Sequence, residues 1–331
     1  LDIKSEKGKE ILCALIKKSD VILHNFRAGV VDRLGLDYES VRAMNPSIVY
    51  TVISGFGAKG PRSADPAYDG AVQAAAGMMA NNGTAESGPL RTGYMPVDLM
   101  TGMTAAYATT AALLRKQKTG KGQMVDVAML DCAITLGSAN FSRSEVDDIP
   151  DMLIGNQSIA GAPTASSFPT AEGSILTAAI MPNHVEAFFD ELGLREMLND
   201  PKFQTPEARM ENKEIVRDAM IEALKSDTAE NWEKRLAPRG VPVAKINSVK
   251  ETARLEQLQY RNILTAVPAA KGMANGYKLP GAPFTNSEDG PEVMRPAPVL
   301  GQHTVEILEE IGIEKSIIST LAAEGVICKD D

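Results

Sequence analysis

The sequence has few of the residues that build disulfides and metal sites. Its 331 residues include three cysteines, three histidines and one tryptophan. The cysteines are odd in number and widely scattered, so they predict no disulfide framework and favour a reducing, cytoplasmic location. No two histidines have the spacing of a zinc site, and we therefore expect no metal. These residues are Cys13, Cys132, Cys328, His24, His184 and His303.

Positive charge and long apolar runs are also scarce. The net charge of −9 argues against a nucleic-acid partner, which requires a cationic surface. The longest apolar run, residues 103–114, contains three threonines and is too short to cross a bilayer, so no membrane partner is expected. The 44% of hydrophobic and 23% of charged residues are typical of a globular protein, and the length suggests about two domains.

Strand and helix patterns alternate along the first part of the chain. Ser5 precedes an apolar stripe of helical spacing, and a glycine at position 120 is expected to end the longest helix. Strands are expected at residues 20–24, 48–53 and 124–128, and further helices at 30–34, 38–44, 69–79 and 98–118. This alternation predicts an α/β fold with a parallel sheet.

The pattern changes after about Ser142 to that of a smaller α+β region. Strands are expected at residues 174–180 and 241–246, and helices at 183–192, 206–225, 229–236, 304–311 and 315–323. Residues 1–4 have the composition of a strand end and there is no initiator methionine, which predicts a chain that begins inside an element.

Two glycine-rich segments are poor candidates for nucleotide binding. Residues 55–60 spell G-x-G-x-x-G, but the dinucleotide motif requires a helix to begin there, and Pro61 and Pro66 prevent one. Residues 118–122 end a helix and lack the spacing of a phosphate-binding loop. A serine hydrolase is not supported either, because no G-x-S-x-G motif occurs.

One carboxylate stands at the start of the longest expected helix. Asp98 has two interpretations, and spacing alone does not separate them. It is an N-cap that accepts bonds from free backbone N–H groups, or it is an ionised nucleophile stabilised by the helix dipole. The small residues that follow, such as Gly102 and Ala105, permit close approach of a ligand or of another helix.

The chain resembles the family III CoA-transferases, which include formyl-CoA and carnitine CoA-transferases and the related α-methylacyl-CoA racemases. The resemblance covers nearly the whole chain, in family order. It rests on P-V-D-L-M-T-G at 96–102, R-K-Q-K-T-G-K-G-Q at 115–123, V-D-V-A-M at 125–129, N-F-R at 25–27, D-R-L-G at 32–35, A-Y-D at 67–69 and P-V-L-G-Q-H-T at 298–304.

The resemblance implies an architecture. A Rossmann-like large domain with a parallel sheet would comprise residues 1–165, a smaller α+β domain residues 166–255, and residues 256–331 would return to the large domain. Two chains would interlock as a homodimer. Residues 1–4 would correspond to a strand well inside the complete domain, with the family's first strand and helix, and part of its CoA site, outside this sequence.

The resemblance also implies a site. Asp98 would attack an acyl-CoA and pass through an anhydride and an aspartyl-CoA thioester, while the loop of residues 155–161 excludes water. CoA would be a substrate, a small carboxylic acid the second substrate, and no cofactor would be tightly bound. The residues lining the CoA path would be Lys4, Asn25, Phe26, Arg27, Arg33 and Tyr68. Taken singly, the cations are also consistent with a solvated surface and the aromatic residues with core packing.

Two alternatives remain at this point. Family racemases carry a His–Asp pair where this chain has Tyr68 and Asp69, and a glutamate where it has residues 180–182, Ile-Met-Pro. Methionine exchanges no proton, and tyrosine is a poor base because its reference pKa is about 10. The second alternative is a non-catalytic acyl-CoA-binding protein, against which the retention of Asp98 argues.

Overall fold

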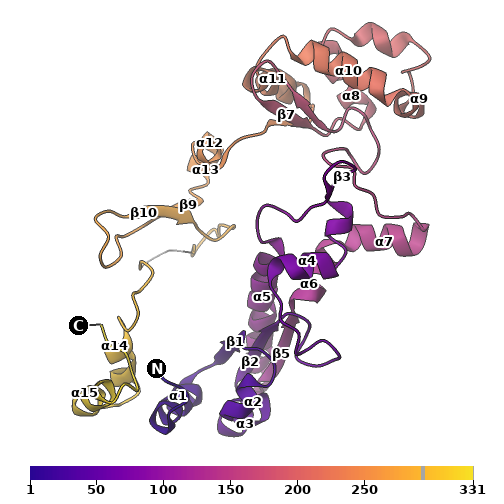
Figure 1. The fold of residues 1–331 in the computed structure, drawn as a ribbon. Coiled ribbons are helices and arrows are strands. Elements are labelled where there is room, and N and C mark those ends of the chain that lie inside the picture. Colours follow the sequence, from indigo (N-terminus) through magenta and orange to yellow (C-terminus); the bar gives the residue numbers. More distant parts are fainter. Residues whose placement is uncertain (292–294, 331) are drawn as a thin grey trace. The chain divides into compact units, whose positions relative to one another are not determined.

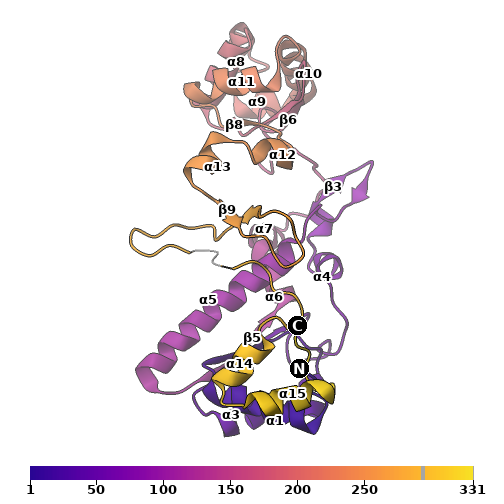
Figure 2. The ribbon, with the colours of Figure 1, turned by 90° about the vertical axis from the view of Figure 1, so that its left-hand side faces the viewer.

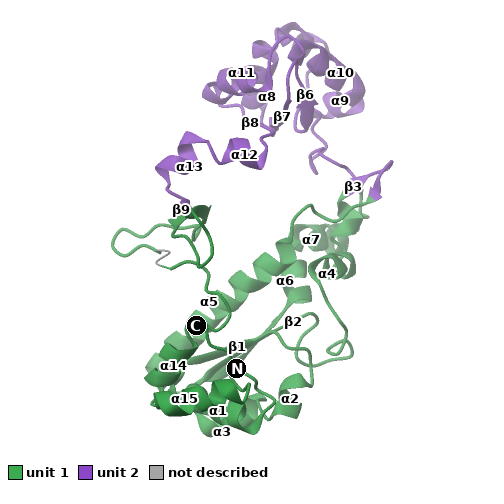
Figure 3. Cartoon of the chain, turned by 60° about the vertical axis from the view of Figure 1, so that its left-hand side comes forward, with its two compact units in different colours: residues 1–82, 89–152, 265–331 green, residues 83–88, 153–264 purple. Residues whose placement is uncertain are grey.

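A computed structural model describes residues 1–291 and 295–330 of the chain, which has a mixed α/β fold (Figure 1). The chain forms two compact units. Unit 1 contains residues 1–82, 89–152 and 265–331, and unit 2 contains residues 83–88 and 153–264 (Figure 3). Unit 1 is therefore assembled from three separate stretches of sequence.

The sheet of unit 1 is parallel, as the alternating pattern predicted. Its strands are β1 (Val21–His24), β2 (Val49–Ser54) and β5 (Gln123–Ala128), in the order β1-β2-β5. Val49 of the central strand pairs with Val21 on one side and Gln123 on the other. The first four residues of β2 are buried, as expected for a parallel strand covered on both faces.

Helices surround this sheet and link its strands. They are α1 (Glu6–Lys18), α2 (Val30–Leu34), α3 (Tyr38–Met44), α4 (Asp69–Ala75), the short 3₁₀ helix η1 (Met79–Asn81), α5 (Pro96–Thr119), α6 (Met129–Leu136) and α7 (Ser138–Asp147). The Ser5 side chain caps α1, and α5 ends at Gly120 with a φ of 71°. Thr109 of α5 and Thr51 of β2 share a hydrogen bond of 2.7 Å between their hydroxyls, which fixes the helix along the sheet.

The C-terminal segment completes unit 1 by covering α1. Helices α14 (Thr304–Glu310) and α15 (Lys315–Ala323) lie beside α1 (Figure 2). Ile11 of α1 is buried with Leu308 and Leu321, and Lys7 forms an ion pair of 2.5 Å with Glu324. The described residues also form two short ladders: β3 (Gly83–Thr84), which belongs to unit 2, pairs with β4 (Gly88–Pro89), and β9 (Leu264–Val267) pairs with β10 (Tyr277–Pro280).

Unit 2 is an antiparallel sheet covered by helices. The strands are β6 (Ser167–Pro169), β7 (Ser174–Thr177) and β8 (Val243–Lys245). The helices are α8 (Pro182–Glu191), α9 (Pro206–Glu211), α10 (Lys213–Leu224), α11 (Ala229–Leu236), α12 (Val249–Thr252), α13 (Glu256–Tyr260) and the 3₁₀ helices η2 (Arg195–Asn199) and η3 (Ala237–Arg239). Phe168, Phe188 and Trp232 belong to its buried core.

Several expectations from the sequence were wrong in detail. Residues 1–4 form a turn and no strand, with the Asp2 N–H donating to the Val326 carbonyl. The helix expected at 206–225 is divided at Asn212, whose side-chain amide bonds to backbone carbonyls. Helix α4 ends early, shortly before Gly77 takes a φ of 76°. Residues 55–60 contain no helix, as predicted.

The described part of the chain contains neither a membrane-spanning helix nor a cluster of metal-binding side chains. Within residues 1–291 and 295–330, no helix combines the length and apolarity needed to cross a bilayer. In the same residues, no cluster of three or more histidine, cysteine, aspartate or glutamate side chains is arranged to hold a metal ion.

Candidate active site

Asp98 lies in the first turn of α5 with an exposed side chain. The helix begins at Pro96, a residue suited to that position because it has no N–H to satisfy. Asp98 is the third helical residue. In the described part of the chain, its carboxylate accepts no hydrogen bond and forms no ion pair, and it is therefore available to a ligand.

The N-cap interpretation of Asp98 is wrong, because another carboxylate caps this helix. The N-cap residue is Met95, which makes no capping bond through its side chain. Instead Oδ2 of Asp69, the first residue of α4, accepts bonds from the backbone N–H groups of Val97 at 2.9 Å and Asp98 at 3.1 Å. Asp69 is only 5% exposed. Asp69 therefore caps α5, and the Asp98 side chain makes no capping bond.

A buried glutamine holds the capping carboxylate in place. Gln73, only 1% exposed, lies one turn after Asp69 on α4. Its Nε2 donates to Oδ1 of Asp69 at 2.5 Å and to the Thr92 hydroxyl at 3.0 Å, and its Oε1 accepts the Thr92 N–H at 3.0 Å. The segment before α5, helix α4 and the start of α5 are thus joined by one polar network, named here the Asp69–Gln73–Thr92 network.

The electrostatic environment makes Asp98 more basic than an ordinary aspartate. Its pKa is raised, chiefly because partial burial withdraws some of its hydrating water and secondly because the charge of Asp69 is close. The N-terminal end of α5 favours the ionised form and opposes this shift. A carboxylate that is less well solvated has a raised pKa, and it is a stronger nucleophile once it is ionised.

Tyr68 directly precedes Asp69 in the chain, and it therefore lies next to the residue that caps α5. It is the N-cap residue of α4 and is 80% exposed. Core packing, the plainer interpretation of its aromatic ring, is therefore wrong. Since Asp69 bonds to the backbone of Asp98, the A-Y-D and P-V-D segments meet at the first turn of α5.

The other candidate residues for CoA binding lie around the first strand. Asn25, Phe26 and Arg27 directly follow β1, Arg33 belongs to α2, and Lys4 lies in the turn before α1. All five side chains are exposed, so core packing is wrong for Phe26 as well. The contacts in the described structure do not join Lys4 or Arg33 to the Asp69–Gln73–Thr92 network.

The role of His24, the last residue of β1, was not predicted from the sequence. Its Nδ1 accepts the N–H of Phe26 at 3.3 Å, and its ring stacks on the Phe26 ring at 5.7 Å. The proton is therefore on Nε2, which lies 3.0 Å from the Tyr50 hydroxyl, and that hydroxyl donates to the Leu36 carbonyl at 2.6 Å. Burial lowers the pKa of His24, which favours this neutral tautomer. His24 thus fixes the orientation of Phe26.

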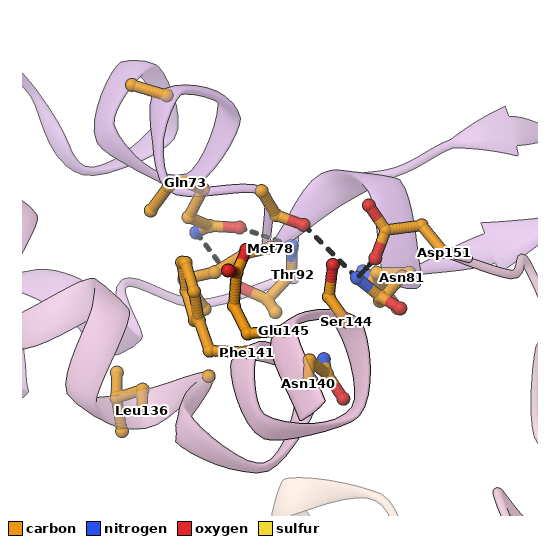
Figure 4. Close-up of a pocket in the computed structure, with 15 residues that line it drawn as sticks. Gln73, Met78, Asn81, Thr92, Leu136, Asn140, Phe141, Ser144, Glu145 and Asp151 are labelled. Atoms are coloured by element: carbon orange, nitrogen blue, oxygen red, sulfur yellow. Dashed lines mark hydrogen bonds between the residues drawn. The ribbon is translucent and has the colours of Figure 1, made fainter. Parts of the chain in front are cut away.

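A pocket of about 520 Å³ adjoins the Asp69–Gln73–Thr92 network (Figure 4). Gln73 and Thr92 line it together with side chains of α7, such as Phe141 and Glu145. Asn81 and Asp151 also line it, and the Asn81 amide donates to the Asp151 carboxylate at 2.6 Å. Asp98 does not line this pocket, which therefore borders the supporting network and not the exposed carboxylate.

Comparison with known proteins identifies the class. A sequence model of CoA-transferase family III matches residues 1–304. An acyl-CoA transferase of Fusarium pseudograminearum is 31% identical over 99% of this chain and 72% of its own length. A formyl-CoA:oxalate CoA-transferase of Streptomyces coelicolor is 31% identical over 99% of this chain and 83% of its own. A CAIB/BAIF family protein from Brucella suis superimposes with a TM-score of 0.82 at 27% identity, covering 94% of this chain and 80% of that one.

These likenesses define a transferase enzyme. The chain belongs to CoA-transferase family III, which confirms the resemblance seen in the sequence.

Proposed function

We propose that this protein moves CoA from an acyl-CoA thioester to a carboxylic acid, with Asp98 as the nucleophile. One observation carries the proposal: Asp98 stands exposed in the first turn of α5 while Asp69 performs the capping for which Asp98 is otherwise suited. A carboxylate that has no structural partner, and whose pKa is raised, is suited to attack a thioester.

The proposed reaction has four steps. A carboxylate oxygen of Asp98 attacks the thioester carbonyl and expels the CoA thiolate, giving a mixed anhydride. The thiolate attacks the aspartyl carbonyl, which releases the donor acid and forms an aspartyl-CoA thioester. The acceptor carboxylate attacks this thioester and again expels the thiolate. The thiolate finally attacks the acceptor's carbonyl in the new anhydride, and Asp98 returns as a carboxylate. Each step exchanges one acyl bond for another, so no nucleotide is consumed.

We further propose that CoA follows the exposed residues after β1. Positive charges that suit its phosphates are supplied by Arg27, Arg33 and Lys4. Phe26 is oriented by His24, which stacks on its ring and accepts its N–H. Tyr68 adjoins the reacting end, because it precedes Asp69. Asn25 completes this set. CoA enters as a substrate, and the mechanism requires no tightly bound cofactor.

For the acceptor we propose a small dicarboxylic acid. Relatives of this chain are named for such acids: oxalate in the Streptomyces coelicolor enzyme, and succinate and glutarate in an enzyme of Agrobacterium fabrum that is 30% identical over 94% of this chain. The alternatives of racemisation and of binding without catalysis receive no comparable support, since the relatives cited here are named as transferases.

We also propose that two copies of the chain form an interlocked homodimer, and that α5 contributes to the contact. Leu99, Met103, Tyr107 and Leu114 recur along α5, and each is more than half exposed. A stripe of large apolar side chains is unusual on a surface that remains in water. Covering it with a second copy removes this apolar area from solvent.

The test is replacement of Asp98 by asparagine, with Asp131→Asn as the matched control. Asp131 is the third residue of α6 and is likewise exposed. We expect Asp98→Asn to reduce CoA transfer, measured by mass spectrometry, by on the order of 10⁴-fold or more, and Asp131→Asn to leave it unchanged. With an acyl-CoA donor, hydroxylamine should modify Asp98 in the unsubstituted protein only. Near-normal transfer by a folded Asp98→Asn protein would show that another residue is the nucleophile.

A further inference from the structure

Unit 2 contains a buried positive charge that the proposed transfer reaction does not use. Arg209, on α9, is only 7% exposed. Its Nη1 donates to the carbonyls of Phe203 at 2.8 Å and Gln204 at 3.1 Å. In the described part of the chain, no carboxylate forms an ion pair with Arg209, and its Nε and Nη2 have no hydrogen-bond acceptor.

The protein engages only part of this guanidinium, because Nε and Nη2 have no acceptor among the described residues and keep some access to solvent. A guanidinium carries five N–H donors, and a buried charge is costly unless it is paired and fully hydrogen-bonded. The two carbonyls are neutral and engage one nitrogen only. Burial lowers the pKa of Arg209, an effect that the charge of Glu207 partly offsets, but an arginine remains protonated at neutral pH. The site thus holds a fixed positive charge with unused donors.

Arg209 lines a pocket of about 300 Å³ that is formed by residues of α8, η2 and α9. The same pocket is lined by Arg195 and by Glu186, which are 3.8 Å apart. That pairing leaves the lining with one net positive charge. Val185 and Leu198 provide an apolar wall, and Gln204 a polar one. Such a mixture of apolar surface with a few convergent polar groups is typical of small-ligand sites.

We propose that this pocket binds a small organic acid with a single carboxylate and an apolar body. The carboxylate would accept two hydrogen bonds from Arg209, a geometry that the planar guanidinium favours. The single negative charge matches the net charge of the lining, and Val185 and Leu198 contact the apolar body. All these residues belong to unit 2, so the site does not depend on the role proposed for Asp98.

The experiment uses 4-bromobenzoate with the whole 331-residue chain carrying Asp98→Asn, so that the acid cannot be turned over. Anomalous scattering from bromine in crystals should place the ligand beside Arg209, and calorimetry should measure its affinity in solution. Arg209→Gln should weaken binding by about tenfold or more, because a charge-assisted pair is lost. Fluorescence of the single tryptophan, Trp232, checks that unit 2 of this variant is folded.

Two surface variants make the test independent of Arg209, whose bonds to Phe203 and Gln204 also support the fold. Arg195→Gln should weaken binding by about fivefold, since Arg195 is half exposed. Glu186→Gln should instead tighten it and admit malonate, a dianion, because the net charge of the lining rises by one. Bromine density away from Arg209, or an affinity that none of the three substitutions changes, would overturn the proposal.

Discussion

Replacing Asp69 by alanine should destabilise unit 1 strongly, although Asp69 is not proposed to react. The substitution removes the acceptor for two backbone N–H groups at the start of α5 and one of the two partners of Gln73 Nε2. Asp98→Ala removes neither that acceptor nor a partner of Gln73, because both contacts are made by Asp69. The pair therefore separates the capping role from the chemical role.

The expected magnitude follows from the burial of each group. Val97 is fully buried, so its N–H finds no water, and leaving it unsatisfied costs about 1–3 kcal/mol. The Asp98 N–H is partly buried and regains some solvent, which makes its loss typical of a cap, about 1 kcal/mol. The bond lost by Gln73 adds about 1 kcal/mol. We expect a total of about 3–5 kcal/mol, a large part of the roughly 5–15 kcal/mol that stabilises a domain.

For Asp98→Ala we expect a change within about 0.5 kcal/mol. The helix dipole favours the charge of Asp98, while partial burial and the repulsion from Asp69 oppose it. These effects act in opposite directions, and no hydrogen bond of the described structure is lost from the Asp98 side chain.

Hydrogen exchange detected by mass spectrometry is the appropriate assay. Backbone exchange in a peptide covering residues 96–102 should accelerate by about 100-fold or more in Asp69→Ala and remain unchanged in Asp98→Ala. Urea unfolding monitored by Trp232 fluorescence reports unit 2 and provides the internal control. If Asp98→Ala accelerated exchange while Asp69→Ala did not, Asp98 would be the cap and the reasoning would be refuted.

Four further outcomes are expected. Transfer requires ionised Asp98, whose pKa is raised, so the rate should fall on acidification at a pH above the ordinary aspartate range, and Asp69→Asn should shift this fall to lower pH. Met103→Glu, in the middle of the apolar stripe of α5, should shift sedimentation toward a monomer; an unchanged dimer would remove that stripe from the interface. Burial raises the pKa of Tyr50 to about 12, so one tyrosine should lack an absorbance change near pH 10, and its contribution to stability should be lost as pH rises from about 10 through about 12. Finally, 2-methylacyl-CoA should take up no deuterium at its α-carbon, whereas uptake dependent on Asp98 would favour a racemase.

Local patterns were sufficient to predict most elements of this fold. Ser5 predicted the start of α1, because a serine before an apolar stripe is a capping signal. Its hydroxyl caps that helix by accepting the Gly8 N–H. The alternation of strands and helices predicted the parallel sheet. Helices α6 and α7 were missed because they carry no such signal: α6 begins directly after β5, and the residue before each helix makes no side-chain capping bond.

The support of Asp98 was not predictable in this way, because it depends on contacts between distant residues. Asp69 caps a helix that begins 27 positions further along the chain, and its own sequence context shows only the start of α4. Nothing in the residues near Gln73 or Thr92 indicates that they bond to each other. Sequence patterns placed a carboxylate at the head of α5, but only the packing of α4 against it distinguishes a cap from a candidate nucleophile.

The covering of α1 by α14 and α15 also determines when this protein can fold during its synthesis. Lys7 and Glu324, which form an ion pair, are 317 residues apart. Unit 2 has left the ribosome long before residues 304–323, and it can fold while the apolar side of α1, including Ile11, is still uncovered. Domains generally fold as units during translation, and exposed apolar surface in the meantime invites aggregation. The core of unit 1 around Ile11 therefore cannot be completed until residues 304–323 have been synthesised, and the apolar side of α1 is open to non-native contacts until then.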